Sequence, residues 1–144
     1  MHKLHRMGLM LCATLAATFA QADVYVIVNA SNPQLSLTHK EAVDLYMGRT
    51  RVFANGDHVL ACDLPRDSAV RASFYRALTG MSPAQVNSYW SRLMFTGQTM
   101  PPQALPNEAA VVELVKHNPG AMGYVSQEPT DKGLHTVLVL KEER

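Results

Sequence analysis

The chain has 144 residues, of which 47% are hydrophobic, and it carries 13 lysines and arginines against 12 acidic residues. This length supplies one modest hydrophobic core rather than two domains. The near balance of charge argues against a nucleic-acid-binding protein, which needs a concentration of basic side chains on one surface. A local anion site is still compatible with this balance.

Residues 1–22 are predicted to be a secretory signal peptide. A basic start, an uncharged apolar run over 7–19 and the small residues of Ala20-Gln21-Ala22 follow the pattern of a cleaved leader. The apolar run is too short to span a bilayer, which takes roughly 20 apolar residues. We therefore expect cleavage after Ala22, a periplasmic location, and a mature protein over 23–144 that is not membrane-embedded.

The predicted mature chain is almost neutral and has a single cysteine. Cleavage removes Lys3 and Arg6, so that 11 of the 13 basic residues remain against 12 acidic ones. Cys12 leaves with the signal peptide, and no internal disulfide is expected. The remaining Cys62 ends the apolar run 59–62 and is interpreted as a buried core residue rather than a reactive thiol.

A strand, a helix and a second strand are predicted first. Residues 23–29 are nearly continuous in apolar character and rich in valine, which is typical of a strand covered on both faces. Thr38 and Glu41 have the spacing of a capping box that begins a helix, and Gly48 is suited to end it. Residues 58–62 then predict the second strand.

Two consecutive helices follow. Asp67 or Ser68 is placed to cap the first of them. Ser82 and Gln85 form another capping box, which begins the second. The apolar stripe of this helix, over 86–94, could line an apolar pocket, but at helical spacing it is interpreted as core.

The last part of the chain is predicted to form a proline-rich loop, a helix and two strands. The loop spans 100–106, Asn107 caps the helix, and the strands lie near 122–126 and 134–140. Apolar strands separated by helices imply an α/β fold with a mostly parallel sheet flanked by helices. No internal repeat or linker interrupts this pattern, so 23–144 is predicted to be one domain.

Motifs for catalysis or metal binding are not found in the sequence. The histidines of the predicted mature chain are scattered rather than spaced as metal ligands. The sequence has no nucleophile elbow, no glycine-rich phosphate loop and no dinucleotide fingerprint. We therefore expect neither an enzyme nor a site for a metal or cofactor.

One polar cluster, Asp63, Arg66, Ser68 and Arg71, lies where the second strand meets the second helix. Ligands of open α/β sheets bind beyond the carboxyl ends of strands, and arginine suits a phosphate or carboxylate. Free N–H groups at the start of the helix would add to such a site. The alternative is structural, with Asp67 or Ser68 as the cap and the arginines paired with Asp63 and Asp67.

Three segments, VNASNP over 28–33, YMGR over 46–49 and PGAMGYVS over 119–126, occur here in a characteristic order and spacing. With them the predicted mature chain resembles, over almost its whole length, the substrate-binding proteins of phosphate ABC transporters. Those proteins have the type II periplasmic binding fold, with two α/β lobes around a cleft. The resemblance implies that this chain forms a single such lobe.

The resemblance also implies a ligand site. In that family a strand-to-helix turn grips phosphate, and Arg66, Ser68 and Arg71 lie where that turn would fall. With Asp63, they form the predicted ligand-binding set. Two features depart from the family. Its glycine-containing turn appears here as Arg66-Asp67-Ser68-Ala69, in which a capping Asp67 would repel phosphate. The chain also begins too late to include the phosphate loop of the other lobe.

Two functional hypotheses follow. The first is a periplasmic solute-binding protein for phosphate or another small oxyanion, which serves an ABC transport system in the membrane. The second is an envelope interaction or accessory protein that kept the fold and lost high-affinity ligand binding. It would contact a membrane transporter or sensor protein, or form a homodimer. An exposed apolar patch near Trp90, Phe95 and Pro101-Pro102 would favour the second hypothesis.

Overall fold

The computed structural model describes residues 23–141, and the predicted signal peptide with its cleavage site and Cys12 lies outside them. The strands are β1 (Val24–Asn29), β2 (Leu60–Asp63), β3 (Gln103–Ala104), β4 (Ala121–Val125) and β5 (Leu134–Leu140). The helices are α1 (His39–Tyr46), α2 (Ala69–Thr79), α3 (Pro83–Phe95) and α4 (Glu108–His117). Within the described range, no helix combines the length and the apolar character that crossing a membrane requires.

The strands form one five-stranded sheet in the order β3-β2-β4-β1-β5. β2 is parallel to both of its neighbours, β3 and β4. The interior strand β1 is antiparallel to both of its neighbours, β4 and β5. The α/β prediction is therefore confirmed, and four strands share one direction as expected, while β1 runs against them. An unbroken apolar strand suits the middle of a sheet in either direction, so its composition did not reveal this reversal.

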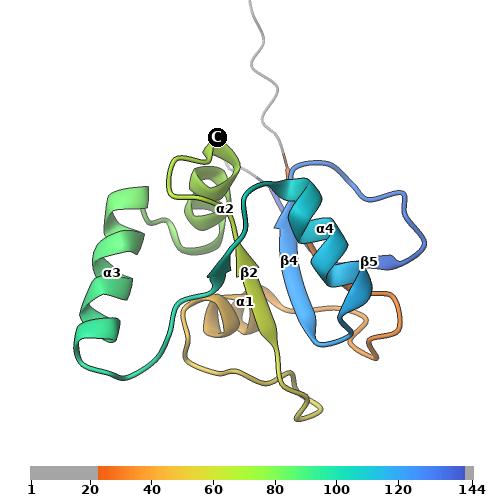
Figure 1. The fold of residues 1–144 in the computed structure, drawn as a ribbon, viewed down its shortest axis with the longest axis horizontal. Helices are drawn as coiled ribbons and strands as arrows, with labels where there is room; N and C mark the ends of the chain where they lie inside the picture. The colour runs from red at the N-terminus through yellow and green to blue at the C-terminus, as the bar shows by residue number, and fades with distance from the viewer. Residues whose placement is uncertain (1–22, 142–144) are drawn as a thin grey trace, which may run out of the picture.

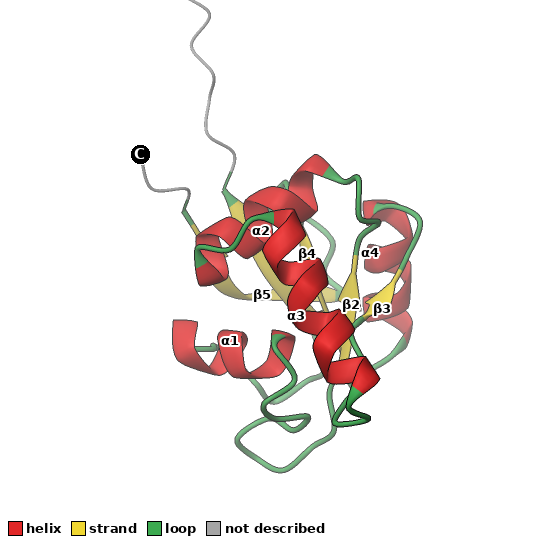
Figure 2. Ribbon diagram, turned by 90° about the vertical axis from the view of Figure 1, so that its left-hand side faces the viewer, coloured by secondary structure: helices red, strands yellow, loops and turns green. Residues whose placement is uncertain are grey.

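The helices cover both faces of the sheet and one of its edges. Figure 1 shows α4 in front of β4, with α1 behind the sheet. In Figure 2 the sheet is seen nearly edge-on, with α4 on one side and α1 and α2 on the other. The helix α3 lies in front of the edge formed by β2 and β3 (Figure 2). This arrangement leaves α3 next to the carboxyl end of β2, where the candidate site is found.

The helix starts are set by local side-chain chemistry. Both predicted capping boxes are confirmed, Thr38 with Glu41 at α1 and Ser82 with Gln85 at α3. At α2 the cap is Ser68, whose hydroxyl accepts a hydrogen bond from the backbone N–H of the third helical residue. The alternative that Asp67 caps this helix is wrong.

Two features around β2 differ from the prediction. The second strand begins at Leu60 instead of His58, because His58 pairs with Val52 in an isolated bridge within the preceding loop. The proline-rich loop contains the short strand β3, whose pairing with β2 is extended by a hydrogen bond from Leu105 N to Asp63 O of 2.9 Å. Prolines are tolerated next to β3 because it lies at the edge of the sheet.

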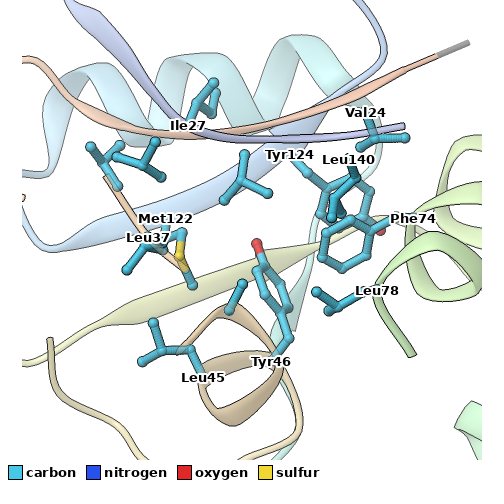
Figure 3. Close-up of a cluster of buried hydrophobic side chains, with 14 of the residues drawn as sticks. Val24, Ile27, Leu37, Leu45, Tyr46, Phe74, Leu78, Met122, Tyr124 and Leu140 are labelled. Carbon is cyan, nitrogen blue, oxygen red and sulfur yellow. The ribbon is translucent and has the colours of Figure 1, made fainter. Parts of the chain in front are cut away.

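A group of aromatic side chains in the core joins α1, α2 and β4 (Figure 3). The rings of Phe74 and Tyr124 are stacked with centroids 3.8 Å apart, and Tyr46 meets Phe74 edge-on at 4.7 Å. Cys62 is fully buried and free, as predicted. Burial, together with the charge of Asp63, raises the pKa of its thiol to about 11, so this thiol is not a nucleophile at neutral pH.

Candidate functional site

Asp63, the last residue of β2, is at the centre of a buried polar network. The parallel register pairs Leu60 with Ala121, and the same register brings Asp63 beside Tyr124. One carboxylate oxygen accepts hydrogen bonds from the Leu64 backbone N–H at 2.8 Å and from the Tyr124 hydroxyl. The other oxygen accepts from the Tyr75 hydroxyl at 2.8 Å and from Arg71 Nε at 3.3 Å.

This network uses the full hydrogen-bonding capacity of the Asp63 carboxylate. A carboxylate offers about four acceptor positions, and four donors occupy them here. The side chain is also 6% exposed. Asp63 is therefore arranged to orient Arg71, Tyr75 and Tyr124 rather than to contact a ligand itself.

The two tyrosines that bind Asp63 are held in their protonated form. Burial, and then the negative charge of Asp63, raises the pKa of both Tyr75 and Tyr124 well above the usual value. A phenol must be protonated to donate a hydrogen bond. Both hydroxyls are consequently permanent donors to the carboxylate at physiological pH.

Arg71 lies in the first turn of α2, one helical turn before Tyr75, so both side chains project from the same face of the helix. Its side chain is 7% exposed, and its guanidinium carbon lies 5.0 Å from the centroid of the Tyr75 ring. Only Nε is bonded to Asp63. The two terminal nitrogens have no hydrogen-bond partner among residues 23–141. Arg71 is thus a buried cation with donors still available.

These donors belong to a pocket of about 210 Å³ that we call the arginine pocket. Asp63, Arg66 and Arg71 contribute one side of it. Arg66 is exposed and forms no ion pair within the described part of the chain. The opposite side comes from α3 and the loop before β3, with the residues Asn87, Trp90, Met94, Pro101 and Pro102.

Three of the four predicted site residues therefore meet in one pocket, and the fourth does not line it. The hydroxyl of Ser68 accepts a hydrogen bond from Arg71 N at 3.1 Å and caps α2. Asp67 is exposed and neither caps the helix nor lines the pocket. The structural alternative is present in part, because Arg71 pairs with Asp63, whereas Arg66 has no such partner in the described residues.

The α3 side of the arginine pocket was not identified from the sequence. The stripe over 86–94 was interpreted as core, and Val86 and Trp90 are indeed buried. Trp90 nevertheless lines the pocket, and its indole N–H is a buried donor with no partner among the described residues. The exposed Met94 and Phe95, at 41% and 93%, continue the apolar surface of α3. The sequence feature that could have indicated this wall is Trp90 on a predicted helix, followed by the adjacent prolines Pro101 and Pro102.

A second and larger pocket, of about 440 Å³, lies beside α4 and the connection between β4 and β5. We call it the acidic pocket, because Glu108, Glu128 and Asp131 line it. Glu108 accepts hydrogen bonds from the backbone N–H and the hydroxyl of Ser126. No group of three or more histidine, cysteine or acidic side chains within residues 23–141 is placed to hold a metal ion.

Comparison with known proteins identifies the fold. A Clostridium perfringens protein assigned to the phosphate ABC transporter substrate-binding proteins, solved with bound phosphate, superposes with a TM-score of 0.64 at 18% identity, over 82% of this chain and 46% of that one. An ABC-type phosphate transport receptor from Vibrio cholerae gives 0.62 at 20% identity, over 81% and 46%. PstS from Borrelia burgdorferi gives 0.60 at 11% identity, over 81% and 47%.

These similarities show a shared fold. The chain spans less than half the length of these three solved structures. No protein-family model and no curated protein matches the chain. The fold is thus that of one lobe of a phosphate-binding-protein-like structure, and the function has to be argued from the site itself.

Proposed function

We propose that this protein is a periplasmic solute-binding protein that binds phosphate or another small oxyanion for an ABC transport system. The observation that carries the proposal is Arg71, a residue that is 6% exposed and lines the arginine pocket, and whose terminal nitrogens have no hydrogen-bond partner among the described residues. Hydrogen bonds from a guanidinium to an oxyanion are charge-assisted and strong, and the terminal nitrogens of Arg71 are available to form them. The structural neighbours described as phosphate-binding and transport proteins support the same choice.

The proposal gives the site residues different roles. Arg66 and Arg71 bind the anion, since a planar guanidinium matches the oxygens of phosphate or a carboxylate. Asp63 fixes the orientation of Arg71 through the bond between its Oδ2 and Nε. Ser68 stabilises the start of the helix that carries Arg71. A periplasmic location rests on the predicted signal peptide over 1–22, and N-terminal sequencing of the exported protein would identify the cleavage site.

Calorimetric titration of the purified protein with phosphate at low salt tests this function. We expect saturable binding, and Arg66→Ala should weaken it about tenfold or more, because it removes a charge-assisted contact from the pocket. Arg76→Ala is the matched control, since Arg76 is an exposed arginine on the same helix and does not line the pocket. A flat titration of the folded protein at millimolar phosphate would overturn the proposal.

One surface supports the second hypothesis, an envelope interaction protein. Phe95 and Met100 are 93% and 68% exposed, near the end of α3 and in the loop that follows it. Large apolar side chains exposed on a surface favour a protein-contact role. If this hypothesis is right, Phe95→Ser abolishes a complex recovered by crosslinking in envelope extracts, or dissociates a homodimer in sedimentation experiments. A monomer that crosslinks to nothing would count against it.

A further inference from the structure

We propose that the arginine pocket binds an organic anion, meaning an oxyanion head group attached to a compact apolar body, in preference to a bare inorganic ion. This inference rests on the proposed function and specifies the class of solute. Four features of the pocket support it: its charge, its lining, its size and the packing of its tryptophan.

The charge of the pocket matches a singly charged head group. Arg66 and Arg71 bring two positive charges, and Asp63 brings one negative charge in direct contact with Arg71. One positive charge is therefore left for the ligand to neutralise. A second negative charge on the ligand would lie near the buried Asp63 carboxylate without a cation of its own. A head group that carries a single negative charge, such as a carboxylate or the monoanion of a phosphonate, fits this balance.

Most of the pocket wall is apolar. Besides the charged residues and the amide of Asn87, the pocket has six lining residues that offer carbon or sulfur side chains apart from one indole N–H: Leu64, Trp90, Met94, Pro101, Pro102 and Ala104. An inorganic ion keeps its own hydration shell and gains little from such surfaces. An apolar substituent would instead remove this surface from water, which is favourable at roughly 25 cal/mol per Å².

The size of the pocket exceeds the need of an inorganic ion. A single water occupies roughly 10–15 Å³ of such space, whereas the pocket measures about 210 Å³. Small-molecule sites are typically concave, mostly apolar and supplied with a few convergent polar groups. The arginine pocket has this composition, with two arginines among its polar lining residues and residues of α3 among its apolar ones.

Trp90 is a fixed wall of this pocket. Behind it lies Gly48, which has a positive φ of 72°, and a Cβ at that position would lie 2.8 Å from Cη2 of Trp90. The indole is therefore packed directly against the backbone, and its N–H has no partner among residues 23–141. A side chain that is already fixed before the ligand binds loses little conformational entropy on binding. This packing also gives a physical reason for a glycine in the YMGR segment.

The experiment uses Trp90, the only tryptophan of the chain, as a reporter inside the pocket. Fluorescence and calorimetric titrations compare three probes: inorganic phosphate, methylphosphonate and phenylphosphonate. We expect affinity to increase in this order, with phenylphosphonate about tenfold or more tighter than phosphate. The fluorescence of Trp90 should change most for phenylphosphonate. Arg66→Ala should weaken all three probes.

A matched pair of variants locates the apolar contact. Met94→Asn places a polar side chain in the pocket wall, and we expect it to reduce the advantage of phenylphosphonate over phosphate by about threefold or more. Met100→Asn makes the same change at a methionine outside the arginine pocket and should leave the advantage unchanged. Met94 and Met100 are 41% and 68% exposed, so neither change buries a new polar group.

Each remaining outcome rejects a defined part of the proposal. Equal affinity for phosphate and phenylphosphonate would overturn the organic-anion inference and leave the proposed function standing. Binding of phenylphosphonate that survives Arg66→Ala unchanged would overturn it as well, because the head group would then make no contact. No binding of any probe to the folded protein would overturn the proposed function together with the inference.

Discussion

The arginine pocket and the acidic pocket lie at the same end of the sheet, yet their lining residues carry opposite net charges. β2 and β4 are parallel neighbours, so their carboxyl ends, at Asp63 and Val125, face the same way. The acidic pocket is about 440 Å³ and the arginine pocket about 210 Å³. The larger pocket is the poorer anion site, because its lining residues include three carboxylates and no arginine or lysine.

The difference comes from how each pocket uses its carboxylates. Asp63 is buried and accepts hydrogen bonds from four donors. The terminal nitrogens of Arg71 are therefore the hydrogen-bond donors that remain available in the arginine pocket. In the acidic pocket, Asp131 bonds to Lys116 at 2.8 Å, and this contact lowers its pKa and keeps it charged. Glu128 remains exposed there. Donors without partners, rather than volume, therefore distinguish the proposed ligand site from the acidic pocket.

The largest expected effect comes from removing the charge at the centre of the arginine pocket. Asp63→Asn leaves Arg71 buried without its counter-charge, and we expect the free energy of unfolding to fall by about 3–5 kcal/mol. Glu108→Gln is the matched change in the acidic pocket and should cost less than about 1.5 kcal/mol, because Glu108 is only half-buried. Urea unfolding monitored by circular dichroism measures both, and equal losses would remove the distinction between the two pockets.

A second effect tests the close packing beside the acidic pocket. A Cβ at Gly123 of β4 would overlap Cγ1 of Val111 and lie 3.5 Å from Cγ2 of Val115, so α4 would have to move. We expect Gly123→Ala to cost about 1–3 kcal/mol in urea unfolding. Val111→Ala makes room for the added methyl group, so the double variant should be more stable than the sum of the two single losses. If the losses in free energy of unfolding were strictly additive, Val111 of α4 would not pack directly against Gly123.

The helix starts and the α/β class could be predicted because they depend on neighbouring residues. Thr38 and Glu41, or Ser82 and Gln85, are three residues apart, and each pair satisfies free N–H groups by itself. The structural alternative, in which the two arginines pair with Asp63 and Asp67, anticipated the Arg71–Asp63 pair, since the strand and the helix that carry them are consecutive. Such short-range relations can be read from spacing alone.

The remainder of the site depends on contacts between distant residues. Tyr124 reaches Asp63 across 61 residues, and only the register of β4 against β2 brings them together. The reversal of β1 is a property of sheet assembly, which its apolar composition does not encode. Trp90 looked like core because it is buried, and its place in the pocket wall follows from where α3 lies against the β2 edge. The division of roles between Ser68 and the arginines likewise needed the geometry of the pocket.

A third, intermediate effect is the response of the arginine-pocket network to alkaline pH. The pKa of Tyr124 is raised in the folded protein above the ordinary value of 10.0, chiefly by burial. Above pH 10 the unfolded chain therefore loses this proton while the folded chain keeps it, and stability declines as pH rises. Each such tyrosine contributes about 1.4 kcal/mol per pH unit to the decline.

Tyr124→Phe should remove this contribution while keeping the stacking on Phe74. The variant starts less stable, because Asp63 loses one donor, but its stability should fall less steeply between pH 10 and 11. Urea midpoints over this range measure the slope. Glu108→Gln, in the acidic pocket, should keep the full slope. An unchanged slope in Tyr124→Phe would mean that the hydroxyl is not buried against the carboxylate.

The smallest expected effect compares the two helix caps that stand near the two pockets. Ser68 caps α2 and Asn107 caps α4, each by accepting a hydrogen bond from a backbone N–H at the third helical position. Replacing either residue by alanine should cost about 1 kcal/mol of stability. Because Ser68 does not line the arginine pocket, Ser68→Ala should also leave anion affinity within about twofold of the unchanged protein, as should Asn107→Ala.

The resemblance to phosphate-binding proteins leads to a different expectation for Ser68, since it places this hydroxyl on the anion. A loss of about tenfold in phosphate affinity for Ser68→Ala, with none for Asn107→Ala, would show that the anion sits at the N-terminus of α2. The arginine pocket would then be a neighbouring hollow rather than the binding site. Equal and small changes in both variants would place the anion beside Arg71, because a cap acts on the helix and not on the ligand. Calorimetry on two conservative variants thus separates the two locations.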